Sequence, residues 1–147
     1  MTRRYYAVPD TSYVREVPQP LQHLANGDMA KRLGGEIVFY TMEDHYTLRS
    51  MEVILGKLAD KPEIDGVVFF RLAQFFDAGR LQVDLIRRIL DLGYSIAFAR
   101  ERLSIPDAAA LRSMYPLIWS CAYLETRDAD RSFIKACLGE IATAPLA

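Results

Sequence analysis

The sequence predicts an α/β fold of three layers: a parallel four-stranded sheet with helices on both faces, followed by two C-terminal helices. Up to Ile105, short apolar segments rich in β-branched and aromatic residues alternate with longer segments whose apolar residues recur at helical spacing. After Pro106 only the helical pattern continues. Strands that alternate with helices are typically parallel, because each crossover helix returns the chain to the same edge of the sheet.

The segment 66–70, Gly-Val-Val-Phe-Phe, is the predicted central strand. It is apolar throughout, which is typical of a strand that is buried on both faces. The polar residues Arg71 and Gln74 come next, and we expect both to surface at the carboxyl end of this strand. In open parallel sheets ligands bind at that edge, so the sequence indicates where a functional site would lie.

The other strands and helices are predicted from turn residues and periodicity. Three further strands are expected at residues 5–8, 36–40 and 95–99. Three helices are expected between the strands, at residues 18–33, 47–58 and 80–92. In the first helix the apolar residues at helical spacing are Leu21, Leu24, Ala25 and Met29.

The C-terminal segment is predicted to be helical and rich in apolar surface. Asp107 suits the N-cap of a helix over 108–115, and Pro116 either kinks this helix or starts a new one. Residues 117–124 are apolar on nearly every side, and a last helix begins near residue 128 or 130 and reaches residue 141. A helix that is apolar on nearly every side, as 117–124 would be, is covered by the domain core or by a partner chain. Together with the apolar pair Phe75-Phe76, the segment predicts a homo-oligomer.

The length of 147 residues and the absence of a repeat or linker predict a single domain, 1–147, with the sheet and its helices in 1–105 and a helical extension in 106–147. The net charge of −1 gives no electrostatic reason to bind nucleic acid or a membrane. No segment has the length of a membrane span, and no apolar segment comes after Arg3-Arg4 as in a signal peptide, so we expect a cytoplasmic protein. Cys121 and Cys137 are interpreted as packed thiols rather than a disulfide.

The exits of the four predicted strands should meet at one edge of the sheet. They carry Asp10, then Glu43, Asp44 and His45, then Arg71 and Gln74, then Arg100 and Glu101. Carboxylates accept hydroxyl hydrogens, and arginine pairs with phosphate or carboxylate in a fixed fork, so this set suits a polyhydroxylated or anionic sugar.

We assign roles to seven of these residues. The substrate-binding candidates are Asp10, Arg71, Gln74 and Arg100. The acid/base candidates, if the protein performs chemistry, are Glu43, His45 and Glu101. The alternative interpretation is that all of them are ordinary solvated loop charges and salt bridges.

No metal or cofactor is expected. Glu43-Asp44-His45 are adjacent and point in different directions, and no second His or Cys stands at ligand spacing. The sequence has no glycine-rich phosphate-binding motif. The pair Gly34-Gly35 is interpreted as the end of a helix. The sequence also has no Ser/His/Asp or Cys/His arrangement in a usable context.

The order of elements and the segment 64–70 resemble the catalytic domain of serine recombinases, the resolvases. In that family the first strand ends in Arg-x-Ser, which carries the nucleophile, and arginines after the third strand hold the scissile phosphate. Here the first strand ends Val8-Pro9-Asp10, and Gln74 and Asp77 stand where the arginines would be. The resemblance therefore implies a resolvase-like fold without the recombinase active site.

A closer resemblance covers most of the chain up to Ile105. Five ordered pieces carry it: Val17-Pro18-Gln19, Thr41-x-Glu43, segment 64–69, Leu72-x-Gln74 and Phe98-Ala99-x-Glu101. They resemble the sporadic carbohydrate cluster family, small bacterial proteins found in surface-polysaccharide gene clusters.

This second resemblance implies a protein of surface-carbohydrate biosynthesis that binds a sugar or sugar-nucleotide at the carboxyl ends of the strands. Whether it also modifies that ligand, as an enzyme would, stays open on the sequence alone. The alternative is a catalytically inactive recombinase-like module that mediates protein–protein assembly. A nucleic-acid binder is a third interpretation, which the near-neutral charge disfavours.

Overall fold

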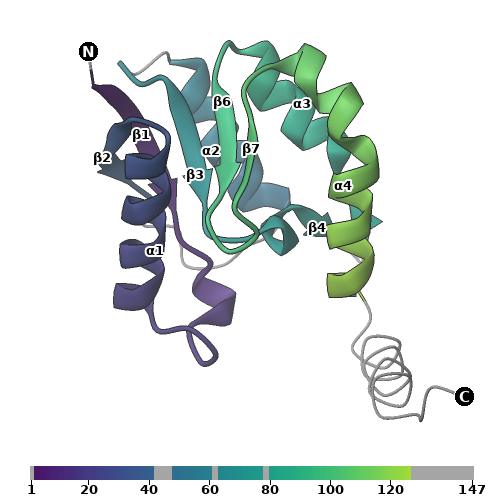
Figure 1. The fold of residues 1–147 in the computed structure, drawn as a ribbon, viewed down its shortest axis with the longest axis horizontal. Coiled ribbons are helices and arrows are strands. Elements are labelled where there is room, and N and C mark those ends of the chain that lie inside the picture. Colours follow the sequence, from purple (N-terminus) through teal and green to yellow (C-terminus); the bar gives the residue numbers. More distant parts are fainter. Residues whose placement is uncertain (1, 42–47, 61–62, 78–79, 127–147) are drawn as a thin grey trace, which may run out of the picture.

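A five-stranded sheet in the order β2-β1-β3-β6-β7 forms the centre of the molecule (Figure 1). The computed structural model describes residues 2–41, 48–60, 63–77 and 80–126. The strands are β1 (Arg3–Val8), β2 (Gly35–Tyr40), β3 (Gly66–Phe69), β6 (Ser95–Phe98) and β7 (Leu103–Ile105). The first four pair in parallel, which confirms the predicted parallel sheet and the central place of β3.

The fifth strand, β7, was not predicted. It pairs antiparallel with β6 after a tight turn in which Arg102 has a positive φ of 54°. Its sequence, Leu-Ser-Ile, is only three residues long and carries little periodic signal. The strand extends the sheet beyond β6 and brings the turn at Arg100 and Glu101 back over the end of β3.

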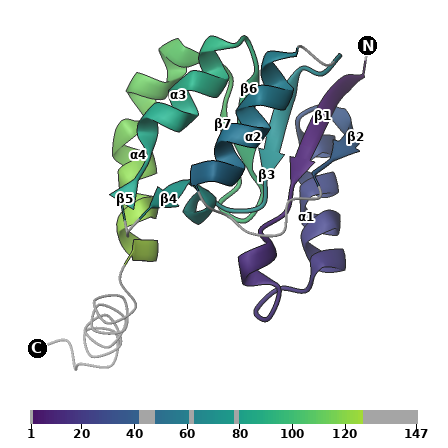
Figure 2. The same ribbon diagram turned by 180° about the vertical axis from the view of Figure 1, so that it is seen from behind.

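The described helices are α1 (Gln19–Arg32), α2 (Leu48–Ala59), α3 (Val83–Asp91) and α4 (Ala108–Thr126). α1 packs on one face of the sheet, where Met29 and Ala30 join Tyr5, Val68 and Ala97. The views from the two sides place α2, α3 and α4 across the other face (Figures 1 and 2). The larger core lies on that side of the sheet. The three-layer prediction is therefore confirmed.

Short elements connect β1 to α1 and β3 to α3. The first is a 3-10 turn, η1 (Thr11–Tyr13). The second connection contains the 3-10 turn η2 (Leu72–Phe75) and the two-stranded ribbon of β4 (Phe76–Asp77) and β5 (Arg80–Leu81). Residues 80–82, which were predicted to begin the third helix, thus precede it.

Phe75 is not part of an exposed interface patch, contrary to prediction. It is 1% exposed and packs edge-on against Phe69 and Phe98, with ring centroids 4.6 and 5.7 Å apart. Only Phe76 of the predicted pair is partly exposed. The turn η2 is therefore anchored to the core, and it holds the exit of β3 in a fixed place.

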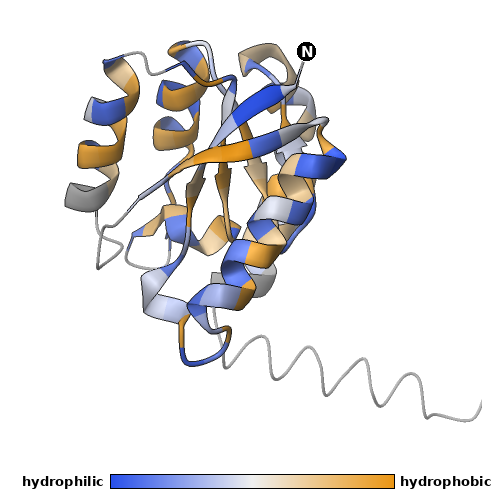
Figure 3. Cartoon of the chain, turned by 90° about the vertical axis from the view of Figure 1, so that its left-hand side faces the viewer, coloured by the Kyte–Doolittle hydropathy of each residue, from blue (hydrophilic) through white to orange (hydrophobic). Residues whose placement is uncertain are grey.

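The face that α1 buries also differs from the apolar pattern of its sequence. Leu21 and Leu24 are exposed, whereas Gln22 and Asn26 are buried against the sheet together with Met29. Figure 3 shows hydrophobic and hydrophilic residues mixed along the visible side of this helix. The polar inner face indicates that the first half of α1 is oriented by hydrogen bonds as well as by apolar packing.

α4 continues through Pro116 as one helix, so this proline does not start a new helix. Ile118 and Ala122 are buried, while Leu117, Trp119 and Tyr123 remain exposed. The last predicted helix, 128–141, and Cys137 lie outside the described residues. Cys121 is partly buried and packs against the core. Among the described helices, none combines the length and apolarity that crossing a bilayer requires.

Gly66 is expected to tolerate no side chain, because β3 passes close to its neighbours there. A Cβ at this position would lie 2.8 Å from the Ser95 carbonyl oxygen and 3.0 Å from the Tyr5 ring. We expect Gly66→Ala to lower the free energy of unfolding by about 1–3 kcal/mol, as overpacking does. Gly56→Ala is the matched control, because nothing lies within 4 Å of its Cβ position in α2 and helix propensity should raise stability by up to about 1 kcal/mol. Urea unfolding distinguishes the two, and equal effects would contradict this packing.

Candidate functional site

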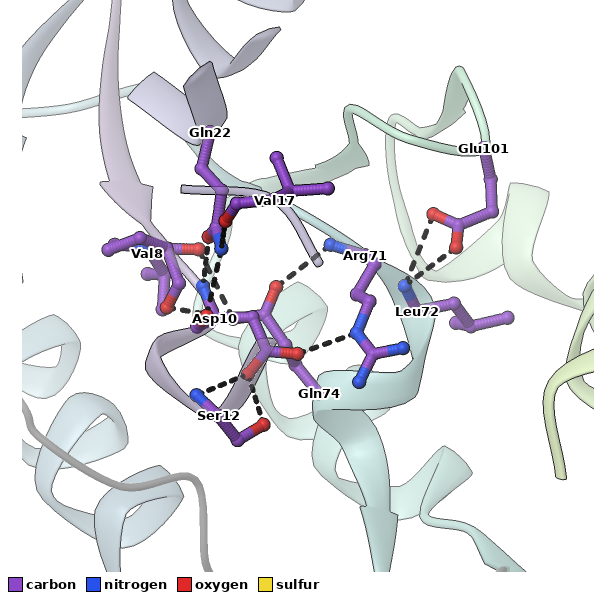
Figure 4. Close-up of polar contacts among 10 residues, drawn as sticks. Val8, Asp10, Ser12, Val17, Gln22, Arg71, Leu72, Gln74 and Glu101 are labelled. Carbon is purple, nitrogen blue, oxygen red and sulfur yellow. Dashed lines mark hydrogen bonds and ion pairs between the residues drawn. The ribbon is translucent and has the colours of Figure 1, made fainter. Parts of the chain in front are cut away.

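The exits of β1 and β3 are joined by an ion pair between Asp10 and Arg71. Arg71 Nε donates to Asp10 Oδ2 at 2.6 Å (Figure 4). β1 and β3 are neighbours in register, Val8 beside Phe69, so the residues two positions beyond each end meet. The Asp10 and Arg71 side chains are 1% and 16% exposed. Asp10 and Arg71, which were predicted as separate binding residues, thus form one largely buried ion pair.

Asp10 is held on its other sides by η1 and α1. Its backbone N–H donates to Gln22 Oε1 at 2.7 Å, and its carbonyl accepts from Gln22 Nε2 at 2.9 Å. Its Oδ1 accepts from the backbone N–H of Ser12 at 3.0 Å and from the Ser12 hydroxyl. The carboxylate therefore faces into the protein, where charge-assisted hydrogen bonds compensate its removal from water.

Gln74 fixes the relation between the two strand exits. Its Nε2 donates to the carbonyl oxygens of Val8 and Pro9, each at 3.2 Å, and its Oε1 accepts from the Arg71 N–H at 2.8 Å. The prediction that Gln74 surfaces is wrong: the residue is 3% exposed. The Gln74 amide donates to and accepts from the backbone, so it holds the two strand exits together, and its contact with a ligand stays a prediction.

Glu101 also has a positioning role. Both of its carboxylate oxygens accept from the backbone N–H of Leu72, at 3.2 Å each (Figure 4). This contact ties the β6–β7 turn to the first residue of η2. In this arrangement Glu101 is an acceptor for protein backbone.

The guanidinium groups of Arg71 and Arg100 lie near one aromatic ring, that of Tyr13. The guanidinium carbon of Arg71 is 3.8 Å from the ring centroid, and that of Arg100 is 5.5 Å from it. Such cation–π contacts hold a guanidinium plane in place without neutralising its charge. Tyr13 itself packs against Phe70, with centroids 6.5 Å apart.

Among the described residues, two guanidinium groups and two carboxylates lie at this edge. Asp10 and Glu101 direct their carboxylates at donors of the protein, and Arg71 and Arg100 bring two cationic groups to the same edge. A guanidinium fork binds phosphate or carboxylate in two parallel hydrogen bonds. The arrangement therefore suits recognition of a phosphate-bearing or carboxylate-bearing molecule.

The predicted acid/base residues Glu43 and His45 lie outside the described residues, so their place at this edge stays a prediction. Within the described part of the chain, no three His, Cys, Asp or Glu side chains gather as a metal site would require.

Sequence reasoning missed Gln22 and Tyr13. The helical spacing offered a signal for Gln22. It shares one face of α1 with Asn26 and with Met29, which belongs to the predicted apolar pattern of the helix. Tyr13 ends the 3-10 turn η1, a short element that the sequence analysis did not predict.

Comparison with solved structures finds a similar fold. The crystal structure of a resolvase family site-specific recombinase from Streptococcus pneumoniae matches with a TM-score of 0.57, over 97% of this chain and 99% of that chain. The fold is resolvase-like. At 12% sequence identity the likeness shows the fold alone. Comparison with protein-family models and with curated proteins gives no match.

Loss of the Asp10 carboxylate should strongly destabilise the fold, because it leaves the Arg71 cation buried without this partner. We expect Asp10→Ala to lower the free energy of unfolding by about 3 kcal/mol. Asp28→Ala is the matched control: Asp28 pairs with Arg32 at 2.8 Å on the surface of α1, and its loss should cost about 0.5 kcal/mol or less. Urea unfolding of both variants gives the comparison. Similar small losses would show that the buried pair contributes no more than a surface one.

Proposed function

We propose that this chain binds an anionic sugar, as a sugar phosphate or a sugar-nucleotide, at the carboxyl ends of β1, β3 and β6. The observation that carries the proposal is the pair of guanidinium groups beside Tyr13. Arg71 and Arg100 would hold the phosphate, and hydroxyl groups of the sugar would meet the polar backbone of the strand exits.

The sugar assignment follows from the resemblance to the sporadic carbohydrate cluster family, and two of the pieces that carry this resemblance fall on residues that build this edge. Within Leu72-x-Gln74, Gln74 holds the exit of β1. Within Phe98-Ala99-x-Glu101, Glu101 binds the N–H of Leu72. We therefore propose a cytoplasmic role in bacterial surface-carbohydrate biosynthesis. Chemical modification of the ligand would require further groups, for which Glu43 and His45 are the candidates.

Ligand-induced stabilisation tests this proposal. Glucose 1-phosphate and uridine diphosphate glucose should raise the melting temperature of the wild-type protein, because a ligand that binds only the folded state stabilises it. Arg100→Gln should weaken binding about tenfold or more, since a hydrogen bond to a charged group contributes about 1.5–3 kcal/mol. Arg71→Lys keeps the charge beside Asp10 and should weaken binding through loss of the planar fork.

The control is Arg3→Gln, an exposed arginine at the opposite end of β1, which should leave both affinities unchanged. Absence of any thermal shift in the wild type, or an equal loss in Arg3→Gln, would contradict the proposal.

A second candidate function is a catalytically inactive recombinase-like module that mediates assembly, including a homo-oligomer. The observation that favours it is a set of exposed apolar residues on α4. Trp119 and Tyr123, one turn apart, are 49% and 61% exposed, and Leu117, on the other flank of the helix, is 52% exposed. Exposed aromatic residues grouped on one helix are typical of a protein contact.

Under this second candidate, Trp119→Arg should convert an oligomer to a monomer in sedimentation velocity, because a charge replaces an apolar contact. Ser113→Glu, at an exposed position one to two turns earlier on α4, should leave the oligomer intact. A wild-type protein that stays monomeric at high concentration would remove this candidate and leave the ligand-binding proposal in place.

A further inference from the structure

A hollow of about 540 Å³ lies between the beginning of α1 and the end of β2. Gln19, His23, Tyr40 and Thr41 line it. The Thr41 N–H donates to the Ala7 carbonyl at 3.1 Å, which fixes this end of β2 beside the exit of β1. The hollow therefore lies at the same sheet edge as the Asp10–Arg71 pair.

The distance to the arginines is set by the strand order. β2 and β3 flank β1, so the exits of β2 and β3 are two strand spacings apart, about 10 Å. The exit of β6, which carries Arg100, is one spacing farther, about 14 Å from that of β2. α1 connects the two places directly: Gln22 binds the backbone of Asp10, while the adjacent His23 and the preceding Gln19 line the hollow. One extended ligand can reach both.

Two rings form a corner of the hollow. The His23 and Tyr40 rings have centroids 4.9 Å apart and are nearly perpendicular, at 87°. Tyr40 is 49% exposed, so part of its ring surface is available to a ligand. A flat ligand ring can stack on one such group and meet the other edge-on, the geometry that aromatic pairs prefer. The volume lies within the range of small-molecule sites.

Polar groups lie beside these rings. The amide Nε2 of Gln19 is 3.3 Å from His23 Nε2. His23 Nδ1 is shielded from solvent and, among the described residues, has no hydrogen-bond partner. The Gln19 amide and the His23 ring both line the hollow, so they offer hydrogen-bond donors and acceptors to a ligand ring.

The charge around the hollow favours a ligand that is also anionic. Gln19 is the first residue of α1, and its N-cap, Pro18, supplies no side-chain hydrogen bond to the helix. The partial positive charge of a helix N-terminus attracts an anion. Beyond it, at the exits of β3 and β6, stand Arg71 and Arg100. A ligand with a flat ring in the hollow and phosphates near the two arginines would have the chemical make-up of a nucleotide.

We propose that the hollow lined by Gln19, His23, Tyr40 and Thr41 binds the base of a nucleotide whose phosphates extend toward Arg71 and Arg100. This inference rests on the proposed function and narrows its ligand to a nucleoside diphosphate sugar rather than a simple sugar phosphate.

Calorimetric titration tests the base subsite with uridine diphosphate, adenosine diphosphate and glucose 1-phosphate as probes. At least one nucleotide should bind the wild type more tightly than glucose 1-phosphate does. Tyr40→Ala should weaken nucleotide binding about tenfold or more, as expected when a base loses an aromatic stacking partner. The same variant should change the affinity for glucose 1-phosphate by less than about twofold, since that probe has no base.

Tyr123→Ala is the matched control, because Tyr123 is an exposed tyrosine on α4. If nucleotides bind no more tightly than glucose 1-phosphate, or if Tyr40→Ala weakens them no more than Tyr123→Ala does, the base subsite is overturned and the anionic-sugar proposal stands. If none of the probes binds and uridine diphosphate glucose also fails, both are overturned.

Discussion

The buried ion pair between Asp10 and Arg71 is the interaction on which the rest of the site depends. Removing two charges from water is costly, and the mutual attraction of the pair compensates only when further hydrogen bonds satisfy both groups. Here Gln22 holds the backbone of Asp10, Gln74 binds the N–H of Arg71, and the Tyr13 ring covers the guanidinium. These contacts join β1, β3, α1 and η1 at one sheet edge.

The proposed function relies on this network of contacts. A site whose groups are already fixed loses little conformational entropy when a ligand binds. The resolvase-like fold supplies the sheet edge. Fold does not determine chemistry, so the function has to be argued from the residues at this edge. Asp10 pairs with Arg71, and Glu101 accepts from the N–H of Leu72. The guanidinium groups of Arg71 and Arg100 are the groups that we propose an anionic ligand would contact.

The sequence predicted the elements better than it predicted the faces they bury. The parallel strands were identifiable because segments such as 66–70 are apolar without interruption. The burial of Gln74 could not be predicted, since it depends on contacts with Val8 and Pro9, far earlier in the chain. The polar inner face of α1 likewise reflects a tertiary partner, Asp10, that outweighs the apolar pattern of the helix. The short strand β7 gave too little local signal.

Chemical-shift mapping tests most directly whether the carboxyl edge of the sheet is the ligand-binding surface. A titration of the isotope-labelled protein with uridine diphosphate glucose would follow the backbone amides and the arginine Nε–H groups. We expect shifts that concentrate at Tyr13, Arg71 and Arg100, with little change at the opposite edge around Arg3 and Gly66. Shifts confined to α4, or the absence of saturable shifts anywhere, would contradict ligand binding at the carboxyl edge.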